Sequence, residues 1–430
     1  MPAMPVMSTR RLIAFFAVCV VLFLPPPKAL ATEIVVTCGN VGGTGNFCES
    51  SVRRWEQATG NRVSYVPLPR QTNDQLDFLR QALAQPDSAP AIDVVLMDSI
   101  WINFVQQYLI DLTPFSAGAE AGHFQTLIGN ASVEGGLKAL PLWSGVGLLY
   151  FRSDLLEKHN EPVPRTWEEL EEVAARIQEA ERRQTPDIWG LVFEAAAGEG
   201  LTSNAIEWLT SLGGAPILDA DGDVALDTPD TRATLRRVRS WIGRISPPEV
   251  TGMTNEDARR FFQDGRAVFM RNWPYAYAPS QNADSPLRGL VGVTTVPGGG
   301  AGQGRGVHGG WYMGVSQHSR HPEIAADLVL HMTSQAEQLH RALFQSQNPT
   351  RPALYVDPDV RAISDFFEIV YDGLQSAVSR PNAQLRMSYI HVSTLFSDAV
   401  NRYLAGDAED PSEVLSDLQA HLSRMQRRGW

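Results

Sequence analysis

Basic residues are in the minority in this chain. Its 36 lysine and arginine residues are outnumbered by 48 aspartate and glutamate residues, which gives a formal net charge of −12. Nucleic acids and anionic membrane surfaces are bound by basic patches, so neither is expected as the main partner. Neutral and cationic ligands remain open. With 43% apolar and 20% charged residues, the composition is that of a globular protein and excludes a largely disordered one.

A long apolar run is also missing. The stretch Leu12–Leu24 has 13 residues, whereas a helix needs about 20 to cross a bilayer. It follows Arg10 and Arg11 and precedes the small-x-small sequence at 29–31, which is the pattern of a secretory signal peptide. We therefore predict a cleaved leader over residues 1–31 and a soluble mature chain with a net charge of −15. A retained anchor is the alternative.

Cysteine is scarce, with three residues in the chain. Cys19 lies inside the leader and has apolar residues on both sides, so it is a poor site for lipid attachment. Cys38 and Cys48 remain after cleavage, and an even count in an exported chain is typical of a disulfide. The short glycine-rich loop between them can fold back to bring the sulfurs together. Two buried free thiols are the alternative, and no histidine lies near in the sequence to complete a metal site.

The start of the mature chain alternates between strand and helix patterns. Strands are expected at 34–37, 63–66 and 92–97, and helices at 49–58 and 74–85. This β-α-β-α-β order is typical of an open, mostly parallel sheet. Ligands bind such sheets beyond the carboxyl ends of the strands, and Asp98 stands at one of these ends.

A second lobe is expected from near Leu142. Thr166 and Glu169 form a capping-box pattern ahead of a helix that runs to about Arg182. Pro229 suits the first turn of another helix, because its missing N–H costs nothing there. Strands are also expected at 147–151, 267–270 and 290–296. The glycine-rich stretch 298–310 lacks a Lys-Ser or Lys-Thr ending, which favours a flexible surface loop over a nucleotide site.

Several short segments occur in a fixed order along the whole mature chain, and each is weak alone. They are Trp55 with Gly60, then 93–101, 109–113, 141–150, 154–156, 166–170, 199–202, 265–275, 309–311 and 349–351. In this order they resemble the extracellular sugar-binding proteins of bacterial ABC importers (family 1 solute-binding proteins), the maltose- and trehalose-binding group in particular.

The resemblance implies an α/β, two-lobed periplasmic-binding-protein fold of type II. Each lobe would hold a mostly parallel sheet flanked by helices, and three hinge crossings would join the lobes. Carried over to this chain, the N-terminal lobe combines 32–141 with 291–344, and the C-terminal lobe combines 142–290 with 345–430. The crossings are then expected near residues 141, 291 and 345.

A pyranose ring has apolar faces and polar edges, so its site needs aromatic planes and fixed hydrogen-bond partners. The resemblance favours Trp273 and Trp311 as the planes, and Gly310 allows a close approach. Trp143 is a further candidate, whereas Trp101 is expected to pack in the core. A carboxylate can accept two hydroxyl protons and an arginine fork can donate to two oxygens.

Asp98 is the expected acceptor, with a helix-capping role as its alternative. Arg351 matches a family arginine that reaches the sugar, with a surface ion pair as its alternative. The remaining candidates are Asn40, Arg70, Gln71 and Glu199. The chain departs from many relatives at Ser144, where they carry an acid. A serine cannot replace a carboxylate as a double acceptor, which indicates a different disaccharide or a glycoside.

The resemblance implies a non-catalytic periplasmic monomer that binds a disaccharide or small glycoside, trehalose-like or maltose-like, by hinge closure. Its partners would be the ligand and the membrane permease subunits of an ABC importer, with no cofactor or metal. One alternative is the same fold with a polyol or a polyamine, and a polyamine fits the negative charge. The other is a glycoside hydrolase, which requires two carboxylates across a cleft.

Overall fold

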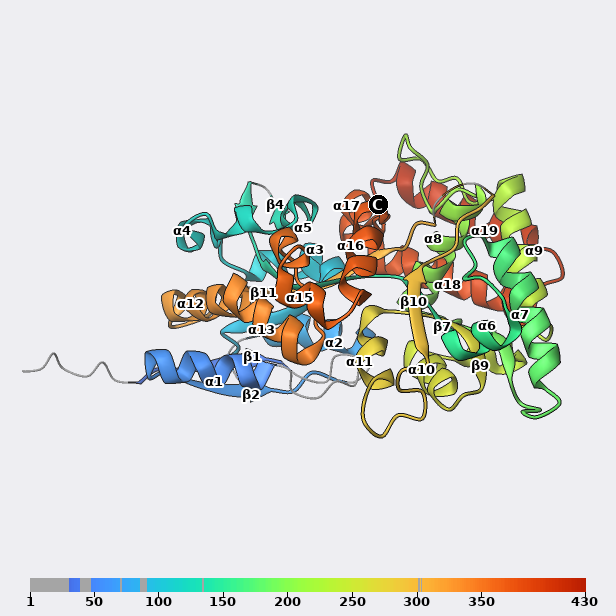
Figure 1. Ribbon diagram of the computed structural model, residues 1–430. Helices are drawn as coiled ribbons and strands as arrows, with labels where there is room; N and C mark the ends of the chain where they lie inside the picture. Colours follow the sequence, from blue (N-terminus) through green and yellow to red (C-terminus); the bar gives the residue numbers. More distant parts are fainter. Residues whose placement is uncertain are drawn as a thin grey trace, which may run out of the picture.

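The computed structural model describes residues 31–38, 48–69, 72–85, 91–133, 135–300, 302 and 304–430. The expected leader, apart from Ala31, lies outside the described residues, as do the candidates Asn40, Arg70 and Gln71. Within the described part, none of the helices has the length and hydrophobicity needed to span a bilayer. The chain folds into two lobes, each built on a sheet with helices around it (Figure 1).

The sheet of the first lobe has five strands in the order β2-β1-β3-β11-β6. In that order their bounds are Arg62–Val66, Glu33–Thr37, Val94–Asp98, His308–Val315 and Leu140–Val146. β1 pairs in parallel with β2 and with β3, whereas β11 runs antiparallel to β3 and β6. Four of the five strands therefore point the same way, which brings their carboxyl ends to one edge.

The sheet of the second lobe has four strands in the order β10-β7-β9-β8. In that order their bounds are Val291–Thr295, Leu148–Arg152, Ala267–Asn272 and Trp189–Val192. β8 and β9 are parallel, and β7 is antiparallel to both of its neighbours. The two-lobed α/β architecture expected from the sequence is confirmed, with one reversed strand in each sheet.

The helices surround these sheets, and a small hairpin joins β4 (Ser132–Val133) to β5 (Gly136–Leu137). Up to β10 the helices are α1 (Cys48–Thr59), α2 (Thr72–Ala84), α3 (Ile102–Val105), α4 (Thr113–Ser116), α5 (Gln125–Ala131), α6 (Ser153–His159), α7 (Trp167–Glu181), α8 (Glu199–Leu212), α9 (Pro229–Trp241), α10 (Asn255–Gln263) and α11 (Tyr277–Ser280). After β11 they are α12 (Pro322–Thr333), α13 (Gln335–Gln345), α14 (Pro352–Tyr355), α15 (Pro358–Ile363), α16 (Phe366–Ser376), α17 (Asn382–Leu385), α18 (Tyr389–Ala405) and α19 (Ser412–Arg427).

Local sequence signals account for several of these elements. The capping box at the start of α7 is formed, because Glu169 N donates to Thr166 Oγ1 at 3.1 Å and Thr166 N donates to Glu169 Oε2 at 3.3 Å. Pro229 opens α9, as expected. Cys38 and Cys48 are joined by a disulfide between the end of β1 and the start of α1. The expected loop at 298–310 ends within β11, so its last residues belong to a strand.

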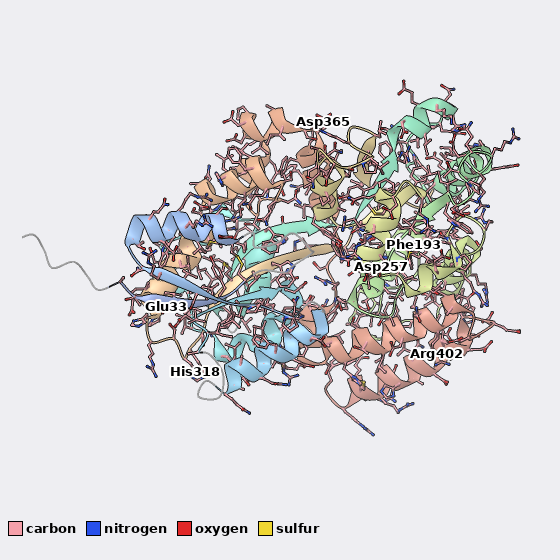
Figure 2. The ribbon with its side chains drawn as sticks, turned by 90° about the horizontal axis from the view of Figure 1, so that it is seen from below. Glu33, Phe193, Asp257, His318, Asp365 and Arg402 are labelled. Atoms are coloured by element: carbon pink, nitrogen blue, oxygen red, sulfur yellow. A yellow bond between two sulfur atoms is a disulfide. The ribbon has the colours of Figure 1, made fainter. Side chains whose placement is uncertain are left out.

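Aromatic side chains dominate the core of the second lobe. Phe193 and Trp208 meet edge to face with 5.4 Å between ring centroids, and Trp167 stacks on Trp241 at 5.3 Å. Phe193 lies in the interior of this lobe, and Arg402 lies among its outer helices (Figure 2). Such rings bury large apolar areas and fix the α7, α8 and α9 helices around the sheet.

The pairing of the strands shows where the chain crosses from one lobe to the other. We call these three points the passages between the lobes. β6 pairs with β11 as far as Val146 and β7 begins at Leu148, so the first passage lies at Gly147 and not near 141. A Cβ at residue 147 would collide with the buried Glu207 carboxylate, which explains the glycine. β10 pairs with β7, so the second passage follows Thr295 and does not precede it.

The third passage also comes later than residue 345. Ser144 N donates to Asn348 O at 3.2 Å and Thr350 Oγ1 donates to Pro141 O at 3.1 Å, so this segment still belongs to the first lobe. α18 packs against α8 in the second lobe. We therefore propose lobe boundaries at Gly147, after Thr295, and between 351 and 388.

Candidate ligand-binding cleft

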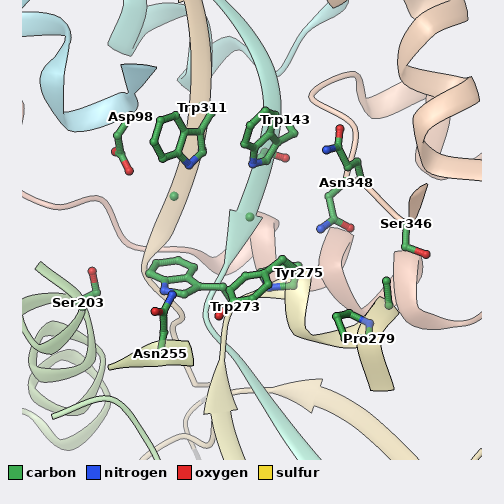
Figure 3. Close-up of a pocket in the computed structure, with 18 of the residues that line it drawn as sticks. Asp98, Trp143, Ser203, Asn255, Trp273, Tyr275, Pro279, Trp311, Ser346 and Asn348 are labelled. Atoms are coloured by element: carbon green, nitrogen blue, oxygen red, sulfur yellow. The ribbon is translucent and has the colours of Figure 1, made fainter. Parts of the chain in front are cut away.

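A cavity of about 680 Å³ lies between the two lobes (Figure 3). Its size suits a small-molecule ligand, because such sites usually measure about 300–1,000 Å³. The first lobe contributes Asp98, Trp143, Ser144, Gly145, Gly309, Gly310, Trp311 and the segment 345–348. The second lobe contributes Glu194, Glu199, Gly200, Ser203, Asn255, Trp273, Pro274, Tyr275, Ala278, Pro279 and Asn282, and Arg380 comes from the third passage.

Three of the predicted residues form one row across the first sheet. Asp98 at the end of β3 lies opposite Trp311 on β11, which in turn lies opposite Trp143 on β6. The two indole rings stack with 5.9 Å between centroids and 25° between planes. Trp101 packs edge to face behind Trp311 at 5.3 Å and is 1% exposed, so it belongs to the core. The row therefore offers a carboxylate followed by two aromatic planes.

Glycines on β11 let the two lobes come close at this row. A Cβ at residue 310 would lie 2.9 Å from Trp143 O, and one at residue 309 would lie 3.0 Å from the Trp273 ring. Gly309 thus leaves room for the indole of the opposite lobe, whereas Gly310 lets β11 lie close to the backbone of β6.

Trp273 follows directly after β9, at the end of that strand. Its backbone is held by Asn272 Oδ1, which accepts from its N–H at 2.8 Å, and by Tyr150 Oη, which donates to its carbonyl at 2.8 Å. The Arg271 guanidinium lies over the ring, 4.5 Å from its centroid. In Figure 3, Trp273 and Tyr275 line the side of the cavity opposite Trp311 and Trp143. The second lobe therefore supplies a fixed aromatic plane of its own.

Arg380 joins the two lobes at one end of the cavity. Its side chain is 4% exposed, and its guanidinium donates to Glu199 Oε1 at 2.9 Å, Asp98 Oδ1 at 3.4 Å and Ser99 Oγ at 3.0 Å. Burial by itself lowers the pKa of Arg380, but Asp98 and Glu199 raise it above its ordinary value. This arginine stays charged and holds a carboxylate from each lobe.

Glu199 is saturated by neighbouring donors. Besides Arg380, Tyr389 Oη donates to Oε1 at 2.5 Å and Ser393 Oγ donates to Oε2 at 2.6 Å. Burial raises the pKa of Glu199, although Arg380, Ser393 and Tyr389 each act to lower it. Glu199 lines the cavity, but its oxygens already serve to position Arg380.

Asp98 both caps a short helical segment and faces the cavity, which are the two roles considered for it from the sequence. Oδ1 accepts from Ile100 N and from Ser99 Oγ at 3.1 Å each, which caps the short helical segment Ser99–Trp101. Among the described residues, Oδ2 has no hydrogen-bond partner, and the side chain lines the cavity. One oxygen is thus available to a ligand hydroxyl while the other fixes the carboxylate.

The carboxyl group of Glu194, on the second-lobe side of the cavity, holds its proton to a higher pH than an ordinary glutamate. Burial raises the pKa of this carboxyl to about 7, in spite of the nearby Arg271 charge. The folded state therefore holds a proton that the unfolded chain releases near its ordinary pKa of 4.5. The free energy of unfolding should therefore fall as pH rises from about 4.5 to about 7, by up to about 3 kcal/mol.

We expect Glu194→Gln to remove this pH dependence. Thermal unfolding followed from pH 4.5 to pH 8 should show a smaller fall in Tm for the variant than for the parent, with the gain largest at pH 8. The exposed Glu249→Gln is the matched control and should follow the parent. Parallel curves for parent and Glu194→Gln would mean that the carboxyl is ionised throughout.

Arg351 does not reach the cavity. Its Nε donates to Thr333 O at 3.1 Å and its Nη2 to Ala119 O at 3.3 Å, both within the first lobe. Among the described residues, the arginine that lines the cleft is Arg380. Sequence reasoning missed it because no motif marks the loop after α16. Sequence reasoning also missed the polar residues Glu194, Ser203, Asn255, Tyr275, Asn282, Gln345, Ser346, Gln347 and Asn348.

Two sheet-containing lobes with an aromatic and polar cleft between them are typical of solute-binding proteins. Comparison with known proteins agrees. Residues 47–339 match the family model described as bacterial extracellular solute-binding protein. A probable ABC transporter-binding protein of Deinococcus radiodurans is 37% identical over 95% of this chain and 97% of its own. The chain therefore belongs to the bacterial extracellular solute-binding proteins.

Solved structures show the same fold. The maltose-bound structure of MalE3 from T. maritima is 32% identical, with a TM-score of 0.84 over 92% of this chain and 100% of its own. A solute-binding protein from Agrobacterium vitis with bound D-mannitol is 20% identical, with a TM-score of 0.77 over 93% and 99% of the two chains. The type II periplasmic-binding-protein fold is thus confirmed. The family consists of binding proteins, and this chain is not an enzyme.

Proposed function

We propose that this protein captures a disaccharide or small glycoside, of the maltose or trehalose type, in the periplasm as a monomer. It would then deliver the ligand to the membrane permease subunits of an ABC importer. The observation that supports this most is the row of Asp98, Trp311 and Trp143, faced by Trp273 from the other lobe. Aromatic planes on both sides of a narrow space suit the apolar faces of sugar rings.

Closure of the two lobes would couple binding to delivery. Trp311 and Trp273 belong to different lobes, so both can contact one ring only in the closed form. A ligand that touches both lobes favours that form by its differential affinity. Arg380 already links Asp98 of one lobe to Glu199 of the other, which places a charged anchor on the hinge side of the cleft.

The rival ligands fit the cleft less well. A polyamine would need carboxylates free to meet its ammonium groups, but Asp98 and Glu199 are both paired with Arg380. A polyol could use the same hydrogen-bond partners, yet it has no flat apolar face to place against Trp311, Trp143 and Trp273. The maltose-bound relative at 32% identity also favours a sugar.

A thermal-shift panel tests this proposal. Neutral disaccharides at about 100 times their dissociation constant should stabilise the protein by about 2.7 kcal/mol, because they bind the folded state only. Mannitol, ribitol, putrescine and spermidine at equal concentration should give smaller shifts. A polyamine shift larger than every sugar shift would contradict the proposal and would favour a cationic ligand.

A further inference from the structure

A buried acid lies where the three passages between the lobes meet. Gly147 N, in the first passage, donates to Val307 O in the second at 3.1 Å. Val378 N, in the third passage, donates to Gly306 O in the second at 2.9 Å. Glu207 on α8 reaches this point from the second lobe, because its Oε1 accepts from Val307 N at 2.8 Å. The three passages therefore converge beside one carboxylate.

The same carboxylate pairs with Arg271 near the end of β9. Arg271 Nε donates to Glu207 Oε2 at 2.8 Å and Arg271 Nη2 donates to Glu207 Oε1 at 2.5 Å, which is the bidentate geometry of an arginine fork. The Glu207 side chain is 0% exposed and that of Arg271 is 2% exposed, so both charges are shielded from water. A Cβ at residue 147 would collide with both groups, so the glycine of the first passage makes room for this pair.

Arg271 extends this arrangement to the ligand cleft. Its guanidinium carbon lies over the Trp273 ring, 4.5 Å from the centroid. Arg271 is buried behind the cavity wall, whereas Trp273 is part of that wall, so the guanidinium covers the face of the indole that is turned away from the cavity. Figure 3 shows the indole of Trp273 across the cavity from Trp311. The ligand is left the face that Arg271 does not cover.

The guanidinium restricts how the indole can rotate. The hydrogen bonds of Trp273 with Asn272 and Tyr150 fix its backbone, but they do not act on its side-chain torsions. A cation over the face of a tryptophan attracts the ring, and the attraction is stronger where both groups are shielded from water. The fork to Glu207 in turn holds the guanidinium in one plane. The carboxylate thus sets the orientation of the indole through Arg271.

We infer that Glu207 is a positioning residue for the ligand site, which orients the Trp273 indole through Arg271 and ties it to the point where the three passages meet. This inference rests on the proposed function, since it takes Trp273 as a ligand-binding plane. Any movement of the lobes that displaces Val307 also acts on Glu207. The orientation of the indole is therefore coupled to the relative position of the lobes, although Glu207 lies outside the cavity lining.

Two variants test this role through ligand affinity. Glu207→Gln keeps a carbonyl oxygen for Val307 N but loses the charge that holds Arg271. Glu207→Gln combined with Arg271→Met removes both charges, and replacing a buried ion pair by neutral groups of similar volume often leaves the stability unchanged. Calorimetry uses maltose and trehalose as probes. Both variants should bind whichever probe the parent binds at least fivefold more weakly, and the double variant should do so at near-parental stability.

Fluorine NMR of protein labelled with 5-fluorotryptophan reports on the indole directly. The Trp273 resonance is assigned by its loss in Trp273→Phe. In the ligand-free parent it should be one narrow line. In both Glu207 variants it should broaden or split, because an indole without the fixed guanidinium samples several orientations. A variant that only lost stability would keep the narrow line.

Glu171→Gln is the matched control. Glu171 also holds an arginine and a tryptophan of the second lobe, since its Oε1 accepts from Arg237 Nε at 2.6 Å and from Trp241 Nε1 at 2.8 Å. It is, however, remote from the cleft lining. The variant should lower the stability, keep the affinity within twofold and keep the narrow Trp273 line.

The two measurements separate this inference from the proposed function. A narrow Trp273 line in both Glu207 variants, or affinities within twofold of the parent, would overturn the positioning role and leave the proposed function standing. If neither maltose nor trehalose bound the parent, that result would count against the proposed function. The Trp273 line of the ligand-free proteins would still decide whether Glu207 orients the indole.

Discussion

Arg380→Ala should reduce sugar affinity more than a hundredfold and destabilise the fold by about 3 kcal/mol. Removing this side chain leaves Asp98 and Glu199 without their shared counter-charge in a mostly buried site. Removing one partner of a buried ion pair costs about 3–5 kcal/mol, because the remaining charges are shielded from water and have no opposite charge to replace its solvation. Chemical unfolding measures the stability, and calorimetry with the neutral disaccharide that gives the largest thermal shift measures the affinity.

Two further variants distinguish a specific role from a general loss of stability. Arg380→Lys keeps the charge but loses the fork that reaches both carboxylates, so it should recover part of the stability and less of the affinity. Arg402→Ala removes an exposed arginine from α18 and should change neither (Figure 2). An Arg380→Ala protein with parental stability would contradict the stabilising role of this buried ion pair.

The position of Arg380 shows where sequence reasoning reaches its limit. Arg351 was favoured because it stands in a recognisable Pro-Thr-Arg segment, but the fold turns its side chain toward the carbonyls of Thr333 and Ala119. Arg380 pairs with Asp98, 282 residues away, and with Glu199, 181 residues away. No local pattern encodes contacts at such separations.

Residues at the ends of strands were predicted better. Asp98 and Trp273 each stand where a strand pattern stops, and the edge of a sheet is where ligands bind in α/β folds. The sequence therefore indicated which side chains reach the crevice. It could not show that Trp311 lies in register with both Asp98 and Trp143, because that register depends on pairing between β3, β11 and β6.

The lobe boundaries have the same explanation. Patterns in the sequence predict strands at 147–151 and 290–296, close to β7 and β10, but they do not say which sheet each strand joins. β10 pairs with β7, so a strand expected in the first lobe lies in the second. β6 stays with β11 through Val146, so the first passage comes a few residues later than expected. Hydrophobic patterns predict which residues of a segment are buried. Which sheet a strand joins depends instead on contacts across the whole fold.

Trp273→Ala should weaken sugar binding at least tenfold while the fold stays intact. Together with Tyr275, the indole forms the aromatic wall that the second lobe presents to the row of the first lobe, and its loss removes the ring that faces Trp311. The side chain lies at the cavity wall rather than in the hydrophobic core, so the free energy of unfolding should change little. Calorimetry gives the affinity, and thermal unfolding without ligand checks the fold.

Trp189→Ala is the matched control for this change. Trp189 is also half-buried and also lies beneath an arginine, with Arg182 4.5 Å from its ring centroid, but it is remote from the cleft lining. It should therefore lose a comparable cation–π contact and keep its affinity within twofold. If Trp273→Ala also stays within twofold, the ligand does not use this indole, and closure must depend on other second-lobe residues of the cleft, such as Tyr275 and Asn255.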